Sequence, residues 1–418
     1  MAQATPFSPN NYIGSARVLE LDGPMSCFCG KVLADLGANV IKIEPPGGDP
    51  SRQFGPFYHE ESDPDKSLFW FSYNTNKRGT TLDLKRTEGN PLFKKLASTA
   101  DIVIESFPPG YLDSLGLGYP DLAAANPRLI MTSITSFGQD GPRRDWLGSD
   151  IVDVAAGGLM YMCGDPDRAP LRMGVSQAHC LAGSQAAVGT LLAHYSRLRT
   201  GKGHHVDVSV QEAVANSLTD AQMHWYVDKR VLTRGARRLY GGRLVRTIWP
   251  CKDGYVAFHF QWGPTGKTSM ASFISLLDRF GEAGELKEVK WETFTGYNLS
   301  QEQLEKFEAV ALRFFTPKTK KVLYDAALKT RALLFPVSTA KDIVESPQLA
   351  ARHYFEQVEH PSIGASITYP GAFFKSDSLT MSIRRPAPRL GEHNEEIFLR
   401  ELGLNPGQFR QLQESGAI

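Results

Sequence analysis

The first two hundred residues alternate between short apolar strands and helices, and this alternation constrains the fold more than any other feature. Val18–Leu21 predicts a strand, residues 24–36 a helix that ends before Gly37, and Asn39–Glu44 a second strand. A crossover helix returns the chain in the same direction, so the two strands are expected to be parallel. The pattern favours a doubly wound α/β domain. Further strands are predicted at 79–84, 101–105 and 128–134, with helices at 88–97 and 111–114.

The chain is too long, at 418 residues, for one simple core, so two domains are expected. Residues 1–215 are assigned to the first part of the large domain. Two strands joined by a turn at 252–254, followed by helices at 268–280 and 301–311, indicate a smaller α+β domain at 225–330. Residues 331–418 are assigned to a linker and a C-terminal return to the large domain.

Charge and composition are those of an ordinary globular protein and predict neither a nucleic-acid nor a membrane partner. Lys and Arg number 46 against 45 Asp and Glu, so the net charge of +1 creates no global field for an anionic polymer. No run of about 18 apolar residues predicts a membrane span, and the N-terminal segment MAQATPFSPNNY lacks the pattern of a signal peptide. Five scattered cysteines favour reduced thiols in a cytoplasmic protein.

Three patterns that suggest a cofactor or a metal fail on their spacing. The turn that runs from Asp22 to Gly30 does not match G-x-G-x-x-G, so no nicotinamide cofactor is expected. The segment GPTGKT has Gln261 where a phosphate-binding loop requires its first Gly. His204 and His205 alternate between two faces and do not reach one metal ion, so no metal is expected.

Seven segments, taken together, resemble the class III CoA-transferases, the family of formyl-CoA transferase and carnitine CoA-transferase that also contains the α-methylacyl-CoA racemases. They follow the family's order over nearly the whole chain and are specific as a set. The resemblance implies a Rossmann-like large domain, a small domain, and two chains threaded through each other as an interlocked dimer. It also implies CoA as the carrier, with an acyl-CoA and a carboxylic acid as substrates. The segments are LADLGANVIKIEPPGGDPSR, NTNKRGTTLDLK, ADIVIESFPPGYLDSLGLGY, NPRLIMTSITSFGQDGP, GSDIVDVAAGGLMYMCGDPDRAP, TGKGHHVDVSV and PAPRLGEHNEE.

The same resemblance implies a CoA site on the loops of the large domain. Ser106 and Thr135 stand where formyl-CoA transferase has Asn and Lys, and Pro45 and Ser114 replace two arginines that steady the CoA phosphates. Arg52 is expected to compensate for one of these. For Lys77 and Arg78 a surface turn remains an equally good explanation. The positions carried over from the family are Gly23, Pro24, Met25, Lys77, Arg78, Ser106, Phe107 and Thr135.

His179 occupies the position of the family's nucleophilic Asp, and neighbouring alignments place Ala178 or Cys180 there. In the family, the Asp attacks the acyl-CoA thioester to form a mixed anhydride, and the CoA thiolate then converts it into an enzyme-bound thioester. Imidazole has no carbonyl carbon and cannot carry CoA in this way. We therefore expect no catalytic residue for transfer in this chain. The racemase pair is also incomplete, because Ser149 stands at its His position.

An Arg-rich stretch, RGARRLYGGRLVRTIW, corresponds to the family's Gly-rich loop. Arg237, Arg238 and Tyr240 are expected to bind a substrate carboxylate, because bidentate Arg pairs suit such groups. A solvated basic loop explains the stretch equally well.

Three functions fit the sequence. The leading hypothesis is the non-nucleophilic subunit of a heteromeric CoA-transferase, whose paralogous partner supplies the Asp. The family member that transfers CoA from succinyl-CoA to benzylsuccinate in anaerobic aromatic degradation has two such subunits. The alternatives are a regulatory protein that binds CoA or acyl-CoA without transfer, and a homomeric thioesterase-like enzyme that uses His179 as a general base.

Overall fold

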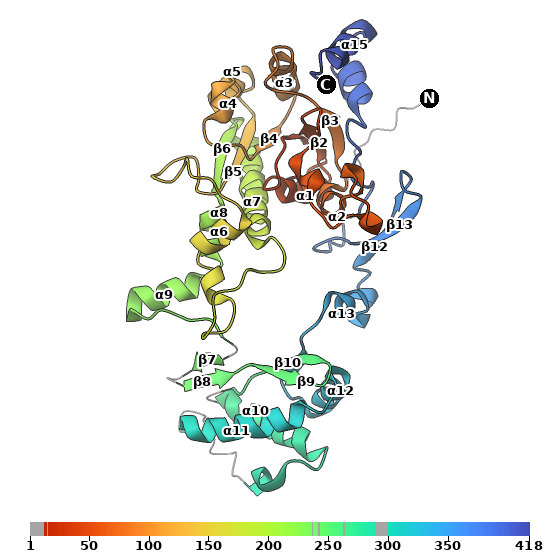
Figure 1. The fold of residues 1–418 in the computed structure, drawn as a ribbon. Helices are drawn as coiled ribbons and strands as arrows, with labels where there is room; N and C mark the ends of the chain where they lie inside the picture. The colour runs from red at the N-terminus through yellow and green to blue at the C-terminus, as the bar shows by residue number, and fades with distance from the viewer. Residues whose placement is uncertain (1–11, 15, 236, 241–242, 262–263, 289–299) are drawn as a thin grey trace. The chain divides into compact units, whose positions relative to one another are not determined.

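The computed structural model describes residues 12–418 except 15, 236, 241–242, 262–263 and 289–299 (Figure 1). The chain divides into two compact units, each with a hydrophobic core of its own. The larger unit combines Met1–Met160, Arg172–Val231 and Gln348–Ile418. The smaller unit combines Tyr161–Leu171 and Leu232–Pro347.

A six-stranded parallel sheet forms the centre of the larger unit, which confirms the predicted α/β class. The strand order is β3-β2-β1-β4-β5-β6, so β2 and β3 follow β1 on one side and β4 to β6 follow it on the other. The order therefore switches between β1 and β4, and ligands of doubly wound sheets bind at such a switch point. The strands are β1 Arg17–Glu20, β2 Asn39–Glu44, β3 Arg78–Thr81, β4 Ile102–Glu105, β5 Ile130–Thr135 and β6 His204–Ser209.

Both faces of this sheet are apolar, as expected for parallel strands covered by helices on each side. Val18 and Leu19 are adjacent in β1 and belong to two different core clusters, because successive strand residues point to opposite faces. Helices α1 and α7 pack on the face of Val18, and α3 packs on the face of Leu19 (Figure 1). The helices of this unit include α1 Cys27–Asp35, α2 Leu68–Asn74, α3 Gly89–Ser98, α4 Tyr111–Ser114, α5 Tyr119–Ala125, α6 Asp150–Ala156, α7 Gln177–Thr200, α8 Val210–Asn216 and α9 Thr219–Asp228.

Helix α7 is rich in small residues because it lies close against α1. A Cβ added to Gly183 would lie 2.9 Å from Phe28 Cβ and 3.1 Å from the backbone nitrogen of Cys29. The small residues on its buried face are Ala178, Ala182, Ala186, Ala187 and Ala193. This close packing fixes the first turn of α7 relative to the sheet.

The C-terminal segment of the larger unit covers the edge strand β3. Asn394 Oδ1 accepts hydrogen bonds from the Thr80 hydroxyl at 2.7 Å and from the Thr81 backbone N–H at 2.9 Å. Ile397 and Phe398 are fully buried in the core of the sheet. This segment contains the hairpin β12 Phe355–His360 and β13 Ala365–Pro370, the helical turn η7 Glu395–Glu401, and the helices α14 Pro347–Ala351 and α15 Pro406–Glu414.

The smaller unit has the predicted α+β character. Its antiparallel sheet has the order β11-β10-β9, and an aromatic core lies between that sheet and the helices. Trp249 and Phe258 are at the centre of this core, and Trp249 Nε1 donates to the Phe258 carbonyl at 2.9 Å. The elements are β7 Arg237–Tyr240, β8 Arg243–Arg246, β9 Ile248–Cys251, β10 Gly254–Phe258, α10 Pro264–Asp278, α11 Gln301–Phe315, α12 Lys320–Thr330, β11 Leu334–Pro336 and α13 Ala340–Val344.

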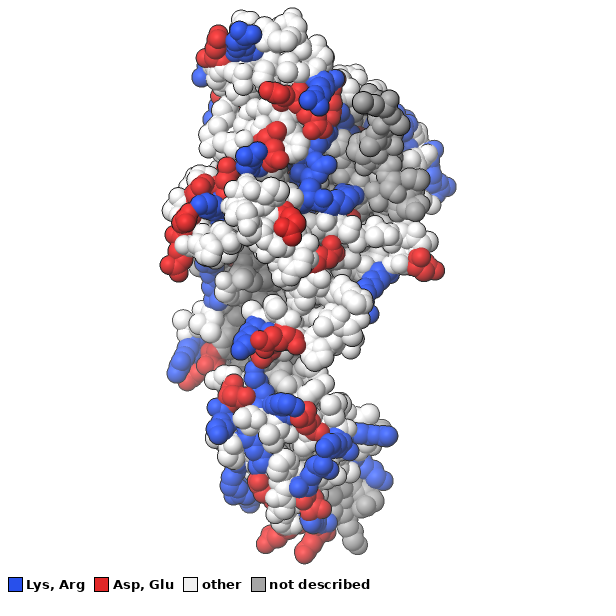
Figure 2. Space-filling view, turned by 90° about the vertical axis from the view of Figure 1, so that its right-hand side faces the viewer, with Lys and Arg blue, Asp and Glu red and all other residues white. Residues whose placement is uncertain are grey.

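Surface charge is mixed in sign, in keeping with the net charge of +1. On the face drawn in Figure 2, Lys and Arg side chains are intermingled with Asp and Glu side chains. Within the described part of the chain, no helix is both long and apolar enough to cross a membrane.

Candidate functional site

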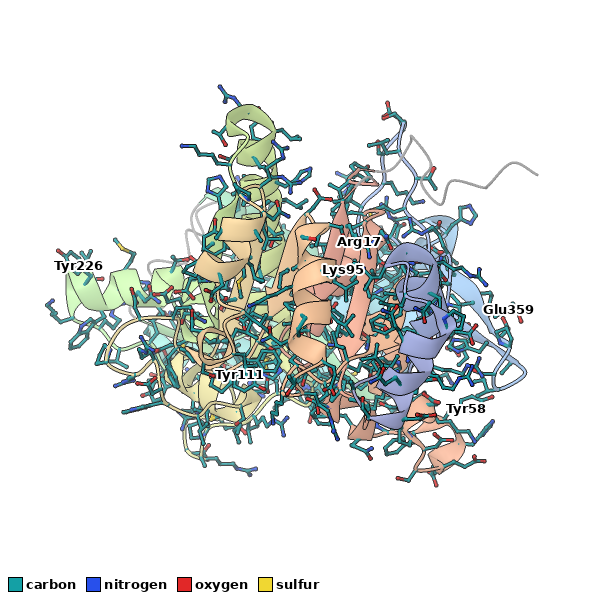
Figure 3. All side chains as sticks on the ribbon, turned by 90° about the horizontal axis from the view of Figure 1, so that it is seen from above. Arg17, Tyr58, Lys95, Tyr111, Tyr226 and Glu359 are labelled. Carbon is teal, nitrogen blue, oxygen red and sulfur yellow. The ribbon has the colours of Figure 1, made fainter. Side chains whose placement is uncertain are left out.

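A cavity of about 240 Å³ opens at the carboxyl ends of β1, β4 and β5, where the switch point of the sheet lies. Of the predicted CoA contacts, Met25, Ser106, Phe107 and Thr135 line this cavity. Phe107 also packs on Tyr111, with 4.7 Å between ring centres, at the loop end of the sheet where Figure 3 labels Tyr111. The opposite wall comes from the loop at 144–148.

The turn after β1 requires glycine at position 23. Gly23 has φ of +123°, and a Cβ there would lie 2.3 Å from Ser106 Oγ. Its backbone N–H donates to Asp49 Oδ2 at 2.8 Å. Gly23 and Pro24 therefore shape the entrance to the first turn of α1, while Met25 is the residue of this turn that reaches the cavity.

A fully buried network of charged side chains contacts the same turn through Asp49. Lys42 Nζ lies 2.8 Å from Asp49 Oδ2 and 3.1 Å from Glu20 Oε1, and Lys77 Nζ lies 2.6 Å from Glu20 Oε2. Burial by itself lowers the pKa of Lys42, but the attraction of Asp49 and Glu20 outweighs it, so the pKa lies well above the usual value. Since Asp49 also accepts from Gly23, the network couples β2 to the cavity loop.

The three cations predicted to contact CoA each have carboxylate partners in the fold. Lys77 is completely buried and also donates to the Cys27 carbonyl at 3.0 Å. Arg52 is 1% exposed and makes a bidentate pair with Glu44, at 2.5 Å and 2.9 Å. None of Arg52, Lys77 and Arg78 lines the 240 Å³ cavity.

Arg52 and Arg78 stabilise contacts between distant segments. The Arg52 guanidinium also lies over the Trp70 ring, 3.7 Å from its centre, and donates to the Pro388 carbonyl at 3.0 Å. Arg78 donates to Glu396 at 2.6 Å and also pairs with Glu401. Both arginines thus join the first half of the chain to its C-terminal segment.

His179 lies in the first turn of α7, and two carboxylates of α6 contact or lie near this turn. Asp150 Oδ1 accepts from the Ala178 backbone N–H at 3.0 Å, and so caps α7. Asp153 Oδ2 lies 3.9 Å from His179 Nε2 and accepts from the Ser136 hydroxyl at 3.3 Å. Burial raises the pKa of Asp153 to about 6 and lowers the pKa of His179.

Asp153 is a site residue that sequence reasoning missed. It is fully buried although it is charged, and the structure places it beside the position of the family nucleophile. The one local signal was the pair of carboxylates in SDIVDV, whose spacing of three residues puts both on one face of a helix. Nothing in the local sequence indicated that this face is opposite His179.

A second cavity of about 240 Å³ lies on the other side of the β4 and β5 ends. Glu105 and His205 line it, and His205 Nε2 lies 2.9 Å from Ser133 Oγ and stacks on Tyr119. Burial raises the pKa of Glu105 to about 7. No local sequence pattern indicated this cavity, because its walls come from four separate segments, at 105–113, 118–120, 131–139 and 205.

The predicted substrate contacts lie in the smaller unit. Arg237, Arg238 and Tyr240 are in β7, and their side chains lie outside the described part of the structure. Arg234 donates to the backbone carbonyls of Asp165 and Arg168, at 3.1 Å and 2.6 Å. Among the described residues, no cluster of three His, Cys, Asp or Glu side chains is placed to hold a metal ion.

The nucleotide-type sheet, the cavity at its switch point and the order of the seven segments define the class of protein. The pattern of CoA-transferase family III matches residues 16–394, and the chain belongs to this family.

Two relatives match nearly the whole chain. It is 36% identical to the succinyl-CoA:(R)-benzylsuccinate CoA-transferase subunit BbsE of Thauera aromatica, over 96% of this chain and 97% of the relative. It is 33% identical to the succinyl-CoA–D-citramalate CoA-transferase of Chloroflexus aurantiacus, over 98% and 99%. A CaiB/BaiF family protein from Brucella suis has a similar crystal structure, with a TM-score of 0.81 and 26% identity over 94% of this chain and 99% of that one.

Proposed function

We propose that this chain is one subunit of a CoA-transferase that moves CoA from an acyl-CoA donor such as succinyl-CoA to a carboxylic acid, and that a paralogous subunit supplies the nucleophilic Asp. The observation that carries the proposal is His179 in the first turn of α7 of a full-length family member. Imidazole has no carbonyl carbon on which the enzyme-bound thioester could form, so this chain alone is expected to be inactive in transfer.

Within this chain, CoA is proposed to bind along the carboxyl edge of the sheet. Met25, Ser106, Phe107 and Thr135 line the cavity there, and the backbone of the Gly23–Pro24 turn borders it. The ion pairs of Arg52, Lys77 and Arg78 support a positioning role for these cations rather than direct contact with phosphate.

Exposed apolar side chains support an obligate partner. Val188, Leu192 and Tyr195 of α7 are 57–64% exposed, and their spacing places them on one face of the helix. Helix α9 also has exposed apolar side chains, and Figure 3 shows one of them, Tyr226, on the projecting end of the helix. We propose that a related subunit covers these helices in an interlocked dimer, since monomeric proteins rarely expose such surfaces.

The acceptor is proposed to be a dicarboxylic acid. The two relatives described above carry benzylsuccinate and citramalate in their names, and both use succinyl-CoA. Arg237, Arg238 and Tyr240 are proposed as the groups that bind the second carboxylate. Five free cysteines suit a reducing compartment, so we propose a cytoplasmic location.

Co-expression with the paralogous subunit tests the proposal directly. We expect native mass spectrometry to show a heteromer, and the heteromer to transfer CoA from succinyl-CoA to benzylsuccinate. An Asp→Asn change at the partner's nucleophile position is expected to abolish transfer, whereas His179→Asn in this chain is expected to leave transfer largely intact. Ordinary transfer by this chain alone would contradict the subunit assignment.

A variant that restores a carboxylate at position 179 tests whether the rest of the CoA site in this chain is intact. His179→Asp returns a carboxylate to the first turn of α7, beside Asp150 and Asp153. If the CoA site is intact, this variant is expected to form an enzyme–CoA thioester that intact-mass measurement detects. The wild-type chain, treated identically, serves as the control and is expected to show no adduct.

A further inference from the structure

We propose that Asp153 and His179 form a general-base dyad that hydrolyses acyl-CoA, an activity of this chain distinct from CoA transfer. The proposal rests on the proposed function only in taking acyl-CoA as the ligand of the neighbouring cavity. It concerns the subunit that lacks the nucleophile, and it does not require the partner's Asp.

The first observation is that each of the two residues has one buried polar atom without a hydrogen-bond partner in the described part of the chain. Among the described residues, neither Asp153 Oδ1 nor His179 Nε2 has a hydrogen-bond partner. Buried polar atoms of this kind are costly and rare in native proteins. Asp153 Oδ2 lies 3.9 Å from His179 Nε2, so a closure of about 1 Å would make a charge-assisted hydrogen bond.

The second observation connects this pair to the cavity. Ser136 lines the cavity and donates to Asp153 Oδ2 at 3.3 Å. Gly148 lines it too, and a Cβ there would lie 1.8 Å from Ser136 Oγ and 2.8 Å from Asp153 Oδ1. Asp153 is therefore directly behind the cavity wall, and only glycine at position 148 leaves room for it.

The third observation is an unused hydroxyl in the same cavity. Thr135 Oγ1 is buried, lines the cavity, and has no hydrogen-bond partner among the described residues. A hydroxyl in this place is suited to donate to the carbonyl oxygen of a bound thioester, where negative charge develops during attack.

The geometry selects hydrolysis over two other reactions. Exchange of an α-proton by two bases requires the bases to lie on opposite sides of the substrate's α-carbon. The 3.9 Å between Asp153 Oδ2 and His179 Nε2 leaves no space for a carbon atom between them. Covalent attack by Asp153 requires its carboxylate to reach the substrate, but the residue is fully buried, whereas the His179 side chain is 16% exposed. His179 is thus the member of the pair that solvent reaches, and Asp153 is linked to the cavity through Ser136.

The reaction balances with water as the only co-substrate. His179 takes a proton from water as the water oxygen attacks the thioester carbonyl carbon, and Asp153 holds the imidazolium that forms. The carbon–sulfur bond breaks, and the thiolate of CoA takes the proton from His179. The products are the carboxylic acid and free CoA, and both side chains return to their starting states. Burial keeps the His179 imidazole neutral near pH 7, as a base must be.

The test measures release of free thiol from succinyl-CoA by the co-expressed heteromer whose partner subunit carries the Asp→Asn change, without any acceptor acid. We expect turnover above the buffer rate, and a decrease of about 100-fold in kcat for His179→Asn and for Asp153→Asn, with KM nearly unchanged. His353→Asn, a change of the same type at an exposed position, is the matched control and is expected to keep full turnover. CoA binding by each variant, measured by calorimetry, shows that the site is still folded.

Three results separate this proposal from its rivals. In heavy-oxygen water, a single turnover should label only the product acid, and label in an enzyme carboxylate would instead show a covalent mechanism. Hydrolysis at the buffer rate, or variants as active as the wild type, would overturn the dyad. Transfer by the heteromer is measured in parallel with the same variants, so loss of the dyad and loss of the proposed transferase function give different outcomes.

Discussion

Replacing Glu105 by Gln should make the protein more stable at alkaline pH and leave its stability at acidic pH unchanged. Glu105 ends β4, is 4% exposed, and accepts from the Phe107 backbone N–H at 2.8 Å. Burial raises its pKa from 4.5 to about 7. That rise corresponds to about 3 kcal/mol, taken as an upper limit.

The direction of the pH effect on stability follows from which state, folded or unfolded, keeps the proton on Glu105. Between pH 4.5 and about 7, the folded protein keeps a proton on Glu105 that the unfolded chain has already released. The free energy of unfolding therefore falls as the pH rises through this window, and the loss is complete above it. A glutamine keeps the acceptor for Phe107 but never ionises, so its contribution does not change with pH.

Chemical denaturation at pH 4.5 and pH 8.5 measures this effect. Glu105→Gln is expected to match the wild type at the lower pH and to exceed its unfolding free energy by as much as about 3 kcal/mol at the higher pH. Glu414→Gln, at an exposed position, is the control for the pH dependence of the rest of the chain. Equal stabilities at pH 8.5, or an equal loss at both pH values, would refute the assignment of a buried, proton-holding carboxyl group.

Four further changes test other parts of the structure. Lys42→Met leaves Asp49 buried without its cation, so urea denaturation should show a loss of about 3–5 kcal/mol. Gly23→Ala forces a side chain into a positive-φ turn, which costs about 1–3 kcal/mol and should weaken CoA binding in calorimetry. Leu192→Asp should lower the yield of the co-expressed heteromer, measured by light scattering against the wild type, because it places a charge on the apolar face that the partner is proposed to cover. Trp249→Ala removes the centre of the smaller unit's core and should destabilise that unit by about 3–5 kcal/mol in scanning calorimetry.

Elements with strong local signals were predicted closely. The strand at Asn39–Glu44 and the helix at Tyr111–Ser114 have the predicted bounds, because alternating apolar residues and flanking glycines mark them locally. The strand predicted at 79–84 is shorter in the structure, at Arg78–Thr81. Its end is set by Asn394, which is more than 300 residues away and binds the Thr81 N–H.

The sequence did not predict the ion-pair partners of the charged residues. The NTNKR segment indicates two cations beside the start of a strand, but it does not show which groups face them. Lys77 pairs with Glu20 and Arg78 with Glu401, so the carboxylates that neutralise them come from a different strand and from the C-terminal segment. Buried cations need such partners, and only packing determines which carboxylates come within reach.

The sequence by itself determined the α/β class, the family and the absence of Asp at position 179, because periodicity and motif order are local properties of the chain. Tertiary structure alone brought Asp153 of α6 to within 3.9 Å of His179 of α7, and placed Ser136, which lines the cavity, within hydrogen-bonding distance of Asp153. These contacts depend on how α6 packs on α7 and how α7 packs on β5. Such packing is decided by the summed burial of many side chains and leaves no mark at the residues that come together.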